Sequence, residues 1–185
     1  MARPIFLEGK RIYLAPLEMD DLDRFCGWFN NPKLRGFLIL PYPTTKMDEK
    51  EFIERKTKSK EDIVLSIAVK KGDRVIGVIG LHQINRVTRC AMLGIAVGDL
   101  KMTSKGLGTE AIRLMLDYGF KSLNLHRIEL FVHDFNVRAQ NAYQRIGFVE
   151  EGRKREALYS DGRYHDELIM AILKDEWLEK RGQRV

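Results

Sequence analysis

The pattern of hydrophobic and polar positions changes along the chain, from segments typical of helices to segments typical of strands. A short strand is predicted at Arg11–Pro16. Two helices follow, at Met19–Phe29 and about Lys46–Ser59, and the first carries acidic residues in its opening turn, where the helix dipole favours them. Between the helices, Asn30–Thr45 holds three prolines around an apolar middle and is predicted to be a loop.

The later part of the chain alternates strands with helices. Ile63–Lys70 and Arg74–Leu81 flank Gly72-Asp73, a dipeptide typical of a tight hairpin, and Cys90–Val97 continues as a third strand. Farther along, the spacing predicts a strand at Arg127–His133, helices at Gly106–Lys121 and Arg138–Ile146, the second closed by Gly147, and a last hairpin of Phe148–Tyr159 and Arg163–Leu173 around Asp161-Gly162.

These elements predict one mixed α/β domain over residues 1–185, because no linker, repeat or low-complexity stretch divides the chain. The sheet is expected to be mostly antiparallel, with about seven strands and flanking helices. A strand-helix-strand crossover is expected from about residue 90 to 134.

Composition narrows the class of protein further. The chain has 44% hydrophobic and 31% charged residues, as is ordinary for a soluble globular protein. No apolar run approaches the roughly 20 residues of a membrane span, and the first residues show no secretory signal. The two cysteines, Cys26 and Cys90, form neither a disulfide framework nor a metal set. We therefore expect a cytoplasmic protein without metal or membrane partner.

The net charge of +6 could indicate attraction to nucleic acid or to a phosphorylated small molecule. The basic residues are mostly interleaved with acidic ones, and the densest cluster, Arg153-Lys154-Arg155, is short. Neither an aromatic-basic sheet motif nor a recognition helix is present, so no nucleic-acid partner is expected.

The most informative segment is the glycine-containing loop that opens a predicted helix at Gly106-Leu107-Gly108-Thr109. Glycines at a helix N-terminus let backbone N–H groups approach an anion, and the helix dipole favours negative charge there. Lys101 and Lys105 add positive charge nearby. A pyrophosphate fits this chemistry. A tight strand-to-helix turn without any ligand explains the glycine spacing equally well.

Two enzyme classes could use such a loop. Gly106-x-Gly108-x-x-Ala111, followed by Glu129, matches the fingerprint of nicotinamide-dinucleotide oxidoreductases. However, the long loop from Gly98 to Lys105 separates the strand from the first glycine, and the strand continues after Glu129. A chain of 185 residues with the loop in mid-sequence also has no room for the usual paired halves.

A second motif favours the other class. In Asn136-Val137-Arg138-Ala139-Gln140-Asn141-Ala142-Tyr143-Gln144-Arg145-Ile146-Gly147-Phe148, the sequence resembles the GNAT superfamily of acyl-CoA-dependent N-acyltransferases. The family pattern is N-x-x-A-x-x-x-Y-x-x-x-G-F, preceded by a glycine loop that Gly106 and Gly108 match. Within the superfamily, the chain is most similar to the branch of ribosomal-protein N-terminal acetyltransferases and spermidine N-acetyltransferases. The resemblance covers most of the chain.

The resemblance implies an enzyme that moves an acetyl group directly from acetyl-CoA to an amine in a ternary complex, without a metal. It makes Tyr143 the acid that protonates the departing thiolate, although a place in the helix core explains this tyrosine too. Asn136 would bind the pantetheine arm or cap its helix. The implied cofactor-binding residues are Ile95, Ala96, Val97, Thr103, Ser104, Lys105, Gly106, Leu107, Gly108, Thr109, Asn136 and Tyr143.

Two departures from the family pattern bear on activity. Thr103 stands where the loop pattern has Gln or Arg, and Met92 stands where relatives often carry a carboxylate. The second departure removes an obvious general base. Glu129, His133, His82 or a water molecule could take that role, and the sequence leaves the choice open.

The acceptor is an amine of a small molecule, such as a polyamine, or of a protein N-terminus. The first loop offers Phe37, Leu38, Ile39, Leu40 and Tyr42 rather than the clustered acids that a polyamine would require. A non-catalytic acyl-CoA-binding regulator is a further hypothesis, supported by Met92. The last strands could pair between chains to form a homodimer.

Overall fold

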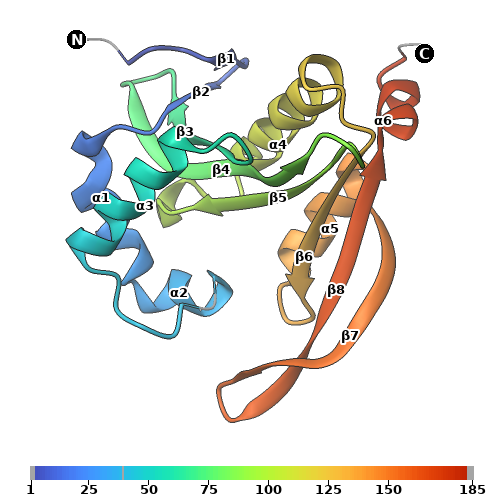
Figure 1. Ribbon diagram of the computed structural model, residues 1–185. Helices are drawn as coiled ribbons and strands as arrows, with labels where there is room; N and C mark the ends of the chain where they lie inside the picture. Colours follow the sequence, from blue (N-terminus) through green and yellow to red (C-terminus); the bar gives the residue numbers. More distant parts are fainter. Residues whose placement is uncertain (1–2, 39, 183–185) are drawn as a thin grey trace. The chain divides into compact units, whose positions relative to one another are not determined.

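The computed structural model describes residues 3–38 and 40–182 of the chain, and Figure 1 shows their arrangement in helices and strands. The strands are β1 (Leu7–Glu8), β2 (Ile12–Pro16), β3 (Ile63–Val69), β4 (Arg74–Asn85), β5 (Cys90–Val97), β6 (Arg127–His133), β7 (Val149–Ser160) and β8 (Arg163–Leu173). The α-helices are α1 (Leu22–Phe29), α2 (Pro32–Leu38), α3 (Lys46–Lys58), α4 (Leu107–Asp117), α5 (Val137–Ile146) and α6 (Lys174–Lys180).

The predicted fold class is confirmed: the chain is a mixed α/β fold with flanking helices and a mostly antiparallel sheet. The predicted crossover is also present, because β5 and β6 are parallel and α4 connects them. In the described residues the sheet has eight strands rather than about seven. The additional strand is β1, which has only two residues, too few to show a period in the sequence.

The segment predicted to be a loop between the first two helices contains a helix, α2. Pro32 is its first residue, a position where the missing N–H of proline is harmless. The helix predicted at Gly106–Lys121 is present: the α-helix begins at Leu107, ends at Asp117 and continues as a π-helical turn, Tyr118–Ser122.

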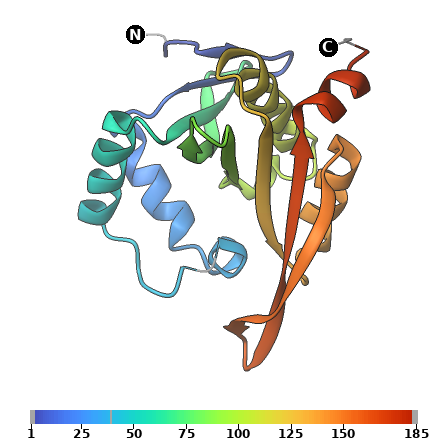
Figure 2. The same ribbon diagram turned by 45° about the vertical axis from the view of Figure 1, so that its right-hand side comes forward.

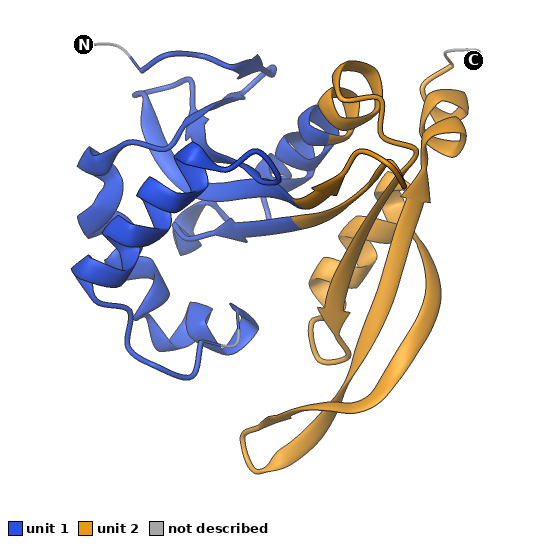
Figure 3. Cartoon of the chain, in the orientation of Figure 1, with its two compact units in different colours: residues 1–82, 94–115 blue, residues 83–93, 116–185 orange. Residues whose placement is uncertain are grey.

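The chain divides into two compact units, which Figure 3 shows in different colours. Unit 1 comprises residues 1–82 and 94–115. Its antiparallel strands β2, β3 and β4 pair in sequence order, and α1 and α3 lie side by side in Figures 1 and 2. Both positions of the predicted Gly72-Asp73 turn have positive φ, as a tight hairpin requires. A buried cluster that includes Tyr13, Phe25 and Ile53 joins these helices to the strands.

Unit 2 comprises residues 83–93 and 116–185. In it, β6 pairs in parallel with the start of β5 and antiparallel with β8, and β8 pairs with β7. The β7–β8 hairpin extends beyond the end of β6, because β6 pairs with β8 only from Glu167 to Leu173 (Figure 2). The buried residues of β6 alternate along the strand as predicted, with Ile128, Leu130 and Val132 inside.

Within residues 3–38 and 40–182, no helix is long and apolar enough to cross a membrane. The same residues contain no group of three or more His, Cys, Asp or Glu side chains arranged to hold a metal ion. Cys26 and Cys90 are both free thiols.

Candidate active site

The loop between β5 and α4 presents backbone N–H groups at the beginning of a helix. Ser104 has a φ of 58° and Gly106 a φ of 75°, in the left-handed region that favours glycine. Helix α4 begins at Leu107, and the first N–H groups of a helix have no carbonyl partner within it. This arrangement fits a pyrophosphate, which accepts such N–H groups and is favoured by the helix dipole.

Arg11, at the beginning of β2, ties this loop to the sheet. Its Nη1 donates to the carbonyl of Lys105 at 2.9 Å, and its Nε donates to Glu110 Oε2 at 2.9 Å. Its backbone N–H also donates to Glu110 Oε1 at 2.8 Å. Burial raises the pKa of Glu110, but the hydrogen bonds from Arg11 outweigh it and lower the pKa overall. The charged carboxylate thereby fixes the first turn of α4.

Strand β5 has one edge that its parallel neighbour covers only in part. The parallel ladder joins Cys90–Met92 to Arg127–Glu129, and in the described part of the chain it does not continue. The predicted cofactor residues Ile95, Ala96 and Val97 lie on β5 after this ladder ends. Their backbone groups on that edge are suited to hydrogen bonding with an extended amide-containing chain.

The substituted position Thr103 has a structural role in this loop. Its hydroxyl donates to the carbonyl of Leu100 at 2.8 Å and so closes a short 3-10 turn, Leu100–Met102. A long Gln or Arg side chain is therefore not needed to shape the loop. At Gly108 a Cβ would make ordinary contacts, 3.4 Å from Val97 and 3.6 Å from Ile95, so packing within the protein does not by itself require glycine there.

Unit 1 contains a pocket of about 450 Å³, within the usual range for small-molecule sites. Its walls come from α1, the α2–α3 segment, α3 and the strands β3, β4 and β5. The lining residues are mainly apolar: Phe29, Leu38, Leu40, Thr44, Asp48, Glu49, Phe52, Arg55, Val64, Val78, Ile79, Gly80, His82, Gly94, Ile95 and Ala96.

Of the apolar residues predicted to shape the acceptor pocket, Leu38 and Leu40 line it. Phe37 and Tyr42 are exposed, at 44% and 80%. Ile39 lies outside the described residues. Two leucines of this segment therefore present apolar side chains to the pocket, and its use by the acceptor stays a prediction.

His82 is the one of the three candidate bases that lines this pocket. Its Nδ1 lies 3.0 Å from Asp62 Oδ1, and Lys56 Nζ contacts the same oxygen at 2.9 Å. Burial raises the pKa of Asp62, but hydrogen bonds from Lys56, Ser59 and His82 outweigh it and lower the pKa to about 2, so this carboxylate is ionised. An ionised carboxylate only accepts hydrogen bonds, so Nδ1 carries the imidazole proton and Nε2 has a free lone pair.

Two glycines make room for the His82 ring. A Cβ at Gly80 would lie 3.0 Å from His82 Nε2, and one at Gly94 would lie 3.1 Å from the same atom. Burial lowers the pKa of His82 below its usual value, although the hydrogen bond to Asp62 opposes this. The imidazole is therefore neutral at neutral pH, as a base must be.

Glu49, a pocket residue on α3, was not anticipated from the sequence. It is only 4% exposed, and its Oε1 is buried without a hydrogen-bond partner. Burial raises its pKa to about 7. In sequence, a glutamate in the first turn of a helix is typical of a solvated residue that the dipole favours, so no local signal distinguished it. Only the packing of the helix places it inside.

The remaining predicted residues belong to unit 2. Asn136 Oδ1 accepts a hydrogen bond from the backbone N–H of Ala139 at 3.3 Å, which confirms that it caps α5. Tyr143 lies on α5, and its ring meets Phe148 edge-on at 5.8 Å. Burial raises the pKa of Tyr143 to about 12, so its hydroxyl remains protonated at neutral pH. This state is suited to proton donation.

The other two candidate bases also lie in unit 2, on β6. Glu129 forms an ion pair with Arg127, 3.1 Å from its Nη2. His133 Nδ1 is buried without a hydrogen-bond partner, and the ring stacks on Phe135 at 5.6 Å. Burial lowers the pKa of His133. Glu129 therefore pairs with an arginine that also pairs with Glu151, whereas His133 retains a ring nitrogen without a hydrogen-bond partner.

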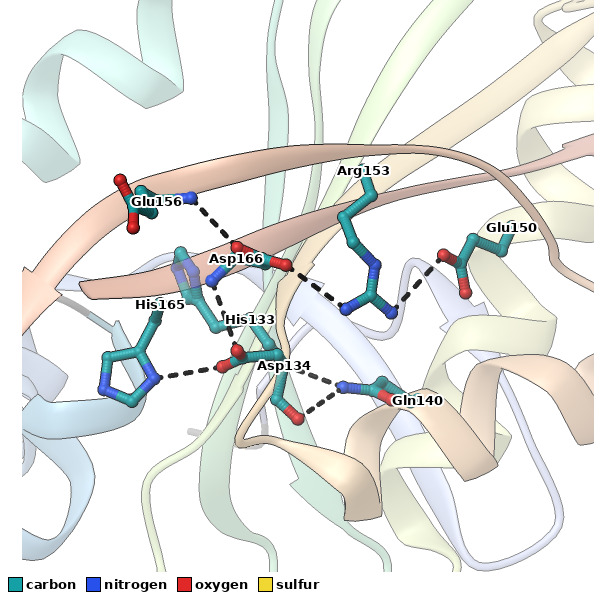
Figure 4. Close-up of polar contacts among 8 residues, drawn as sticks. All are labelled: His133, Asp134, Gln140, Glu150, Arg153, Glu156, His165 and Asp166. Carbon is teal, nitrogen blue, oxygen red and sulfur yellow. Dashed lines mark hydrogen bonds and ion pairs between the residues drawn. The ribbon is translucent and has the colours of Figure 1, made fainter. Parts of the chain in front are cut away.

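Figure 4 shows a polar network around Asp134, next to His133. Asp134 accepts hydrogen bonds from His165 Nδ1 at 3.0 Å and from the backbone N–H of Asp166 at 3.2 Å. Gln140, on α5, donates to the carbonyls of His133 and Asp134 at 2.9 and 3.0 Å. These contacts join β6, β8 and α5 and so position the helix that carries Tyr143.

Comparison with known proteins places this site in a family. Residues 11–149 match the acetyltransferase (GNAT) domain family. The chain is 34% identical to the "Probable N-acetyltransferase YjcK" of Bacillus subtilis over 176 residues, which are 90% of this chain and 96% of the relative.

Solved structures are similar over nearly the whole chain. The structure of spermidine N-acetyltransferase from Vibrio cholerae in complex with CoA and spermine has a TM-score of 0.84 and 30% identity, covering 91% of this chain and 98% of the other. A dodecameric structure of spermidine N-acetyltransferase from Vibrio cholerae in an intermediate state has a TM-score of 0.79 and 29% identity, covering 92% and 98%.

The chain belongs to the GNAT acetyltransferase family. It is an acetyl-CoA-dependent N-acetyltransferase that acts on an amine. This result decides against the nicotinamide-dinucleotide alternative for Gly106-x-Gly108-x-x-Ala111. It also decides for an enzyme over a non-catalytic regulator.

Proposed function

We propose that the chain holds acetyl-CoA along the β5 edge and the loop before α4, and acetylates a primary amine bound in the unit 1 pocket. One observation carries this proposal: two features suited to the cofactor follow each other along the chain. In the described residues, the parallel ladder on β5 ends at Met92 and leaves the rest of that strand edge open. In the loop after β5, Ser104 and Gly106 have positive φ just before α4 begins, where backbone N–H groups lack helical partners. Thr103 to Thr109 would hold the pyrophosphate, and Ile95 to Val97 the pantetheine amides. Acetyl-CoA supplies the acetyl group as a thioester.

His82 is the proposed base. A primary amine with a pKa near 10 is mostly protonated at neutral pH and must lose a proton before it can react. His82 Nε2 has a free lone pair, and the ring lies over Gly80 and Gly94 in the pocket wall. Asp62 keeps the ring in this tautomer and stabilises it once it is protonated.

Tyr143 is the proposed acid. An ordinary tyrosine pKa of 10 already keeps the hydroxyl protonated at neutral pH, and burial raises the pKa of Tyr143 further, to about 12. It would deliver this proton to the sulfur atom as the acetyl group is transferred. Asn136 would hold the pantetheine arm in addition to capping α5.

The acceptor is proposed to be the amine of a small molecule or of a protein N-terminus. The Vibrio cholerae relative binds spermine, which supports a small molecule. The dodecameric relative supports self-assembly of this chain as well, and light scattering after gel filtration measures its oligomeric state. We also propose that residues 1–185 act as a single acetyltransferase domain.

The experiment is a thiol-release assay with acetyl-CoA and a panel of primary amines, comparing the wild-type chain with Tyr143→Phe. Loss of the proton donor is expected to lower kcat by about 100-fold. Acetyl-CoA affinity, measured by calorimetry, should stay within about threefold. Tyr159→Phe is the matched control, because Tyr159 is 64% exposed on β7. An unchanged kcat in Tyr143→Phe would remove this tyrosine from the mechanism.

A further inference from the structure

Glu49 is a buried carboxylate without a partner in the wall of the unit 1 pocket. Its side chain is 4% exposed, and Oε1 has no hydrogen-bond donor. None of the ion pairs found among the described residues involves it. A buried carboxylate usually has a partner, because removing it from water is costly. An unpaired one at a pocket wall therefore indicates that a ligand supplies the partner.

The other ionisable side chains of the pocket do not serve Glu49 in this way. Asp48, its neighbour on α3, accepts hydrogen bonds from the backbone and hydroxyl of Thr45. His82 is engaged by Asp62 through Nδ1. Arg55, on the same helix, is exposed. Glu49 is thus the one pocket carboxylate, among the described residues, that lacks a hydrogen-bonding partner.

The rest of the pocket wall is apolar. Phe29, Leu38, Leu40, Phe52, Val64 and Val78 surround the polar groups. A ligand with one ammonium group can place it on Glu49 and bury an apolar body against this wall. A polyamine brings further ammonium groups, and the other carboxylate that lines the pocket, Asp48, already accepts hydrogen bonds from Thr45, so these groups lose hydration for a weaker partner.

We propose that Glu49 binds the ammonium group of the acceptor, and that the acceptor is a monoamine with an apolar body. This inference rests on the proposed function, because it assigns the substrate class of the same pocket. Glu49 acts by recognition: it selects a cationic nitrogen and holds it in the pocket that His82 also lines. Only then does the amine lose a proton to His82.

The test is calorimetric titration of the full chain, in the presence of CoA, with phenethylamine, spermidine and 2-phenylethanol. The alcohol has the same apolar body as phenethylamine but no charge. At pH 8, phenethylamine is expected to bind about tenfold or more tightly than either of the others. Spermidine binding more tightly than phenethylamine would overturn the monoamine assignment, as would phenethylamine binding no better than the alcohol.

Two variants separate Glu49 from charge effects in general. Glu49→Gln keeps the shape of the side chain and is expected to weaken phenethylamine binding about tenfold, with little effect on the alcohol. Glu51→Gln makes the same charge change on the exposed side of α3 and should leave binding within about twofold. Equal phenethylamine affinity in Glu49→Gln and the wild type would refute the role of Glu49. Circular dichroism establishes that both variants are folded.

The same preparations distinguish failure of this inference from failure of the proposed function. Acetyl-CoA affinity and thiol release test the function, whereas amine affinity tests Glu49. A chain that binds phenethylamine through Glu49 but releases no thiol would leave Glu49 as an ammonium-binding residue and refute the proposed transfer in this pocket. If Glu49→Gln and the wild type acetylate amines at equal rates, the proposed function stands and the role of Glu49 is refuted.

Discussion

At the scale of single residues, burial drives two side chains of one pocket toward their neutral forms. Burial raises the pKa of Glu49 to about 7 and lowers the pKa of His82 below its usual value. Near neutral pH the imidazole is therefore a free base, while Glu49 is close to its titration midpoint. A cationic amine that enters the pocket favours the charged form of Glu49 and so completes the site.

The unpaired Glu49 should reduce the stability of the empty protein. Its pKa is about 7 in the folded chain against an ordinary value of 4.5, so the folded state binds the proton more tightly. Stability from this group is present below pH 4.5 and is lost as the pH rises through 7. Glu49→Gln should therefore stabilise the chain by roughly 1–3 kcal/mol at pH 8.5, and by less as the pH falls toward 4.5.

Scanning calorimetry over this pH range measures the effect, with Glu51→Gln as the control that lacks a buried carboxylate. The midpoint of Glu49→Gln should rise by roughly 2–4 °C for each kcal/mol. Equal midpoints for Glu49→Gln and the wild type at pH 8.5 would mean that burial of the carboxylate does not destabilise the fold.

His82 should determine the acid limb of the pH-rate profile. Its neutral form is the proposed base, and its lowered pKa keeps it neutral to a lower pH than an ordinary histidine. We expect kcat at saturating amine to fall on acidification at a lower pH than an ordinary histidine would give, whereas kcat/KM also reflects the protonation of Glu49, whose pKa is about 7. His82→Gln should lower kcat by about 100-fold or more and abolish the acid limb of kcat.

His126→Gln is the control for His82, because His126 is exposed at the beginning of β6. Acetyl-CoA affinity should be unchanged in both variants. If the His82→Gln variant keeps the acid limb, another group is the base, and His133 with its free Nδ1 is the next to substitute.

The candidate residues also show what single positions in a sequence can and cannot reveal. Asn136, Gly106 and Tyr143 belong to spaced motifs, and a motif is visible without a structure. Glu49 has no such pattern, since its burial depends on how α3 packs against strands far along the chain. The proposal of His82 as the base likewise depends on packing, because packing places His82 at the pocket and pairs Glu129 with Arg127.

At the scale of elements, the sequence predicted segments whose period continues for several turns or residues. Cys90–Val97, Arg127–His133 and Arg163–Leu173 have the predicted bounds in the structure. The sequence did not predict β1, which has only two residues. It also did not predict α2, which begins with a proline in a segment that contains two further prolines. Such segments are set by contacts with the rest of the fold, so local propensity does not specify them.

The Arg11–Glu110 contact couples the loop to β2, and its loss should weaken cofactor binding. Arg11 holds both the Lys105 carbonyl and the Glu110 carboxylate. Arg11→Ala should free the loop before α4 and lower acetyl-CoA affinity by about tenfold, in proportion to one or two charged hydrogen bonds. Calorimetric titration with acetyl-CoA measures this loss.

Lys10→Ala is the matched control for Arg11→Ala, because the neighbouring lysine is exposed and also basic. Its removal should change affinity less than twofold if long-range charge is unimportant. Glu110→Gln should reproduce much of the Arg11→Ala effect, since it breaks the same contact from the other side. Equal losses in Lys10→Ala and Arg11→Ala would instead indicate a general electrostatic effect.

At the scale of the whole molecule, the two compact units share their secondary structure. The chain passes from one unit to the other at residues 82/83, 93/94 and 115/116. These three points lie inside β4, β5 and α4. A strand or helix that belongs to both units cannot remain intact in one while the other unfolds. This continuity supports our proposal that the chain acts as one cooperative domain.

We therefore expect a single thermal unfolding transition, with equal calorimetric and van't Hoff enthalpies. Acetyl-CoA should raise its midpoint without splitting it, because ligand binding stabilises everything that unfolds together. A saturating concentration of about 100 times Kd contributes roughly 2.7 kcal/mol, or about 5–10 °C for a chain of this size. Two resolved transitions, with only one shifted by acetyl-CoA, would mean that the units unfold separately and that the cofactor is held by one of them alone.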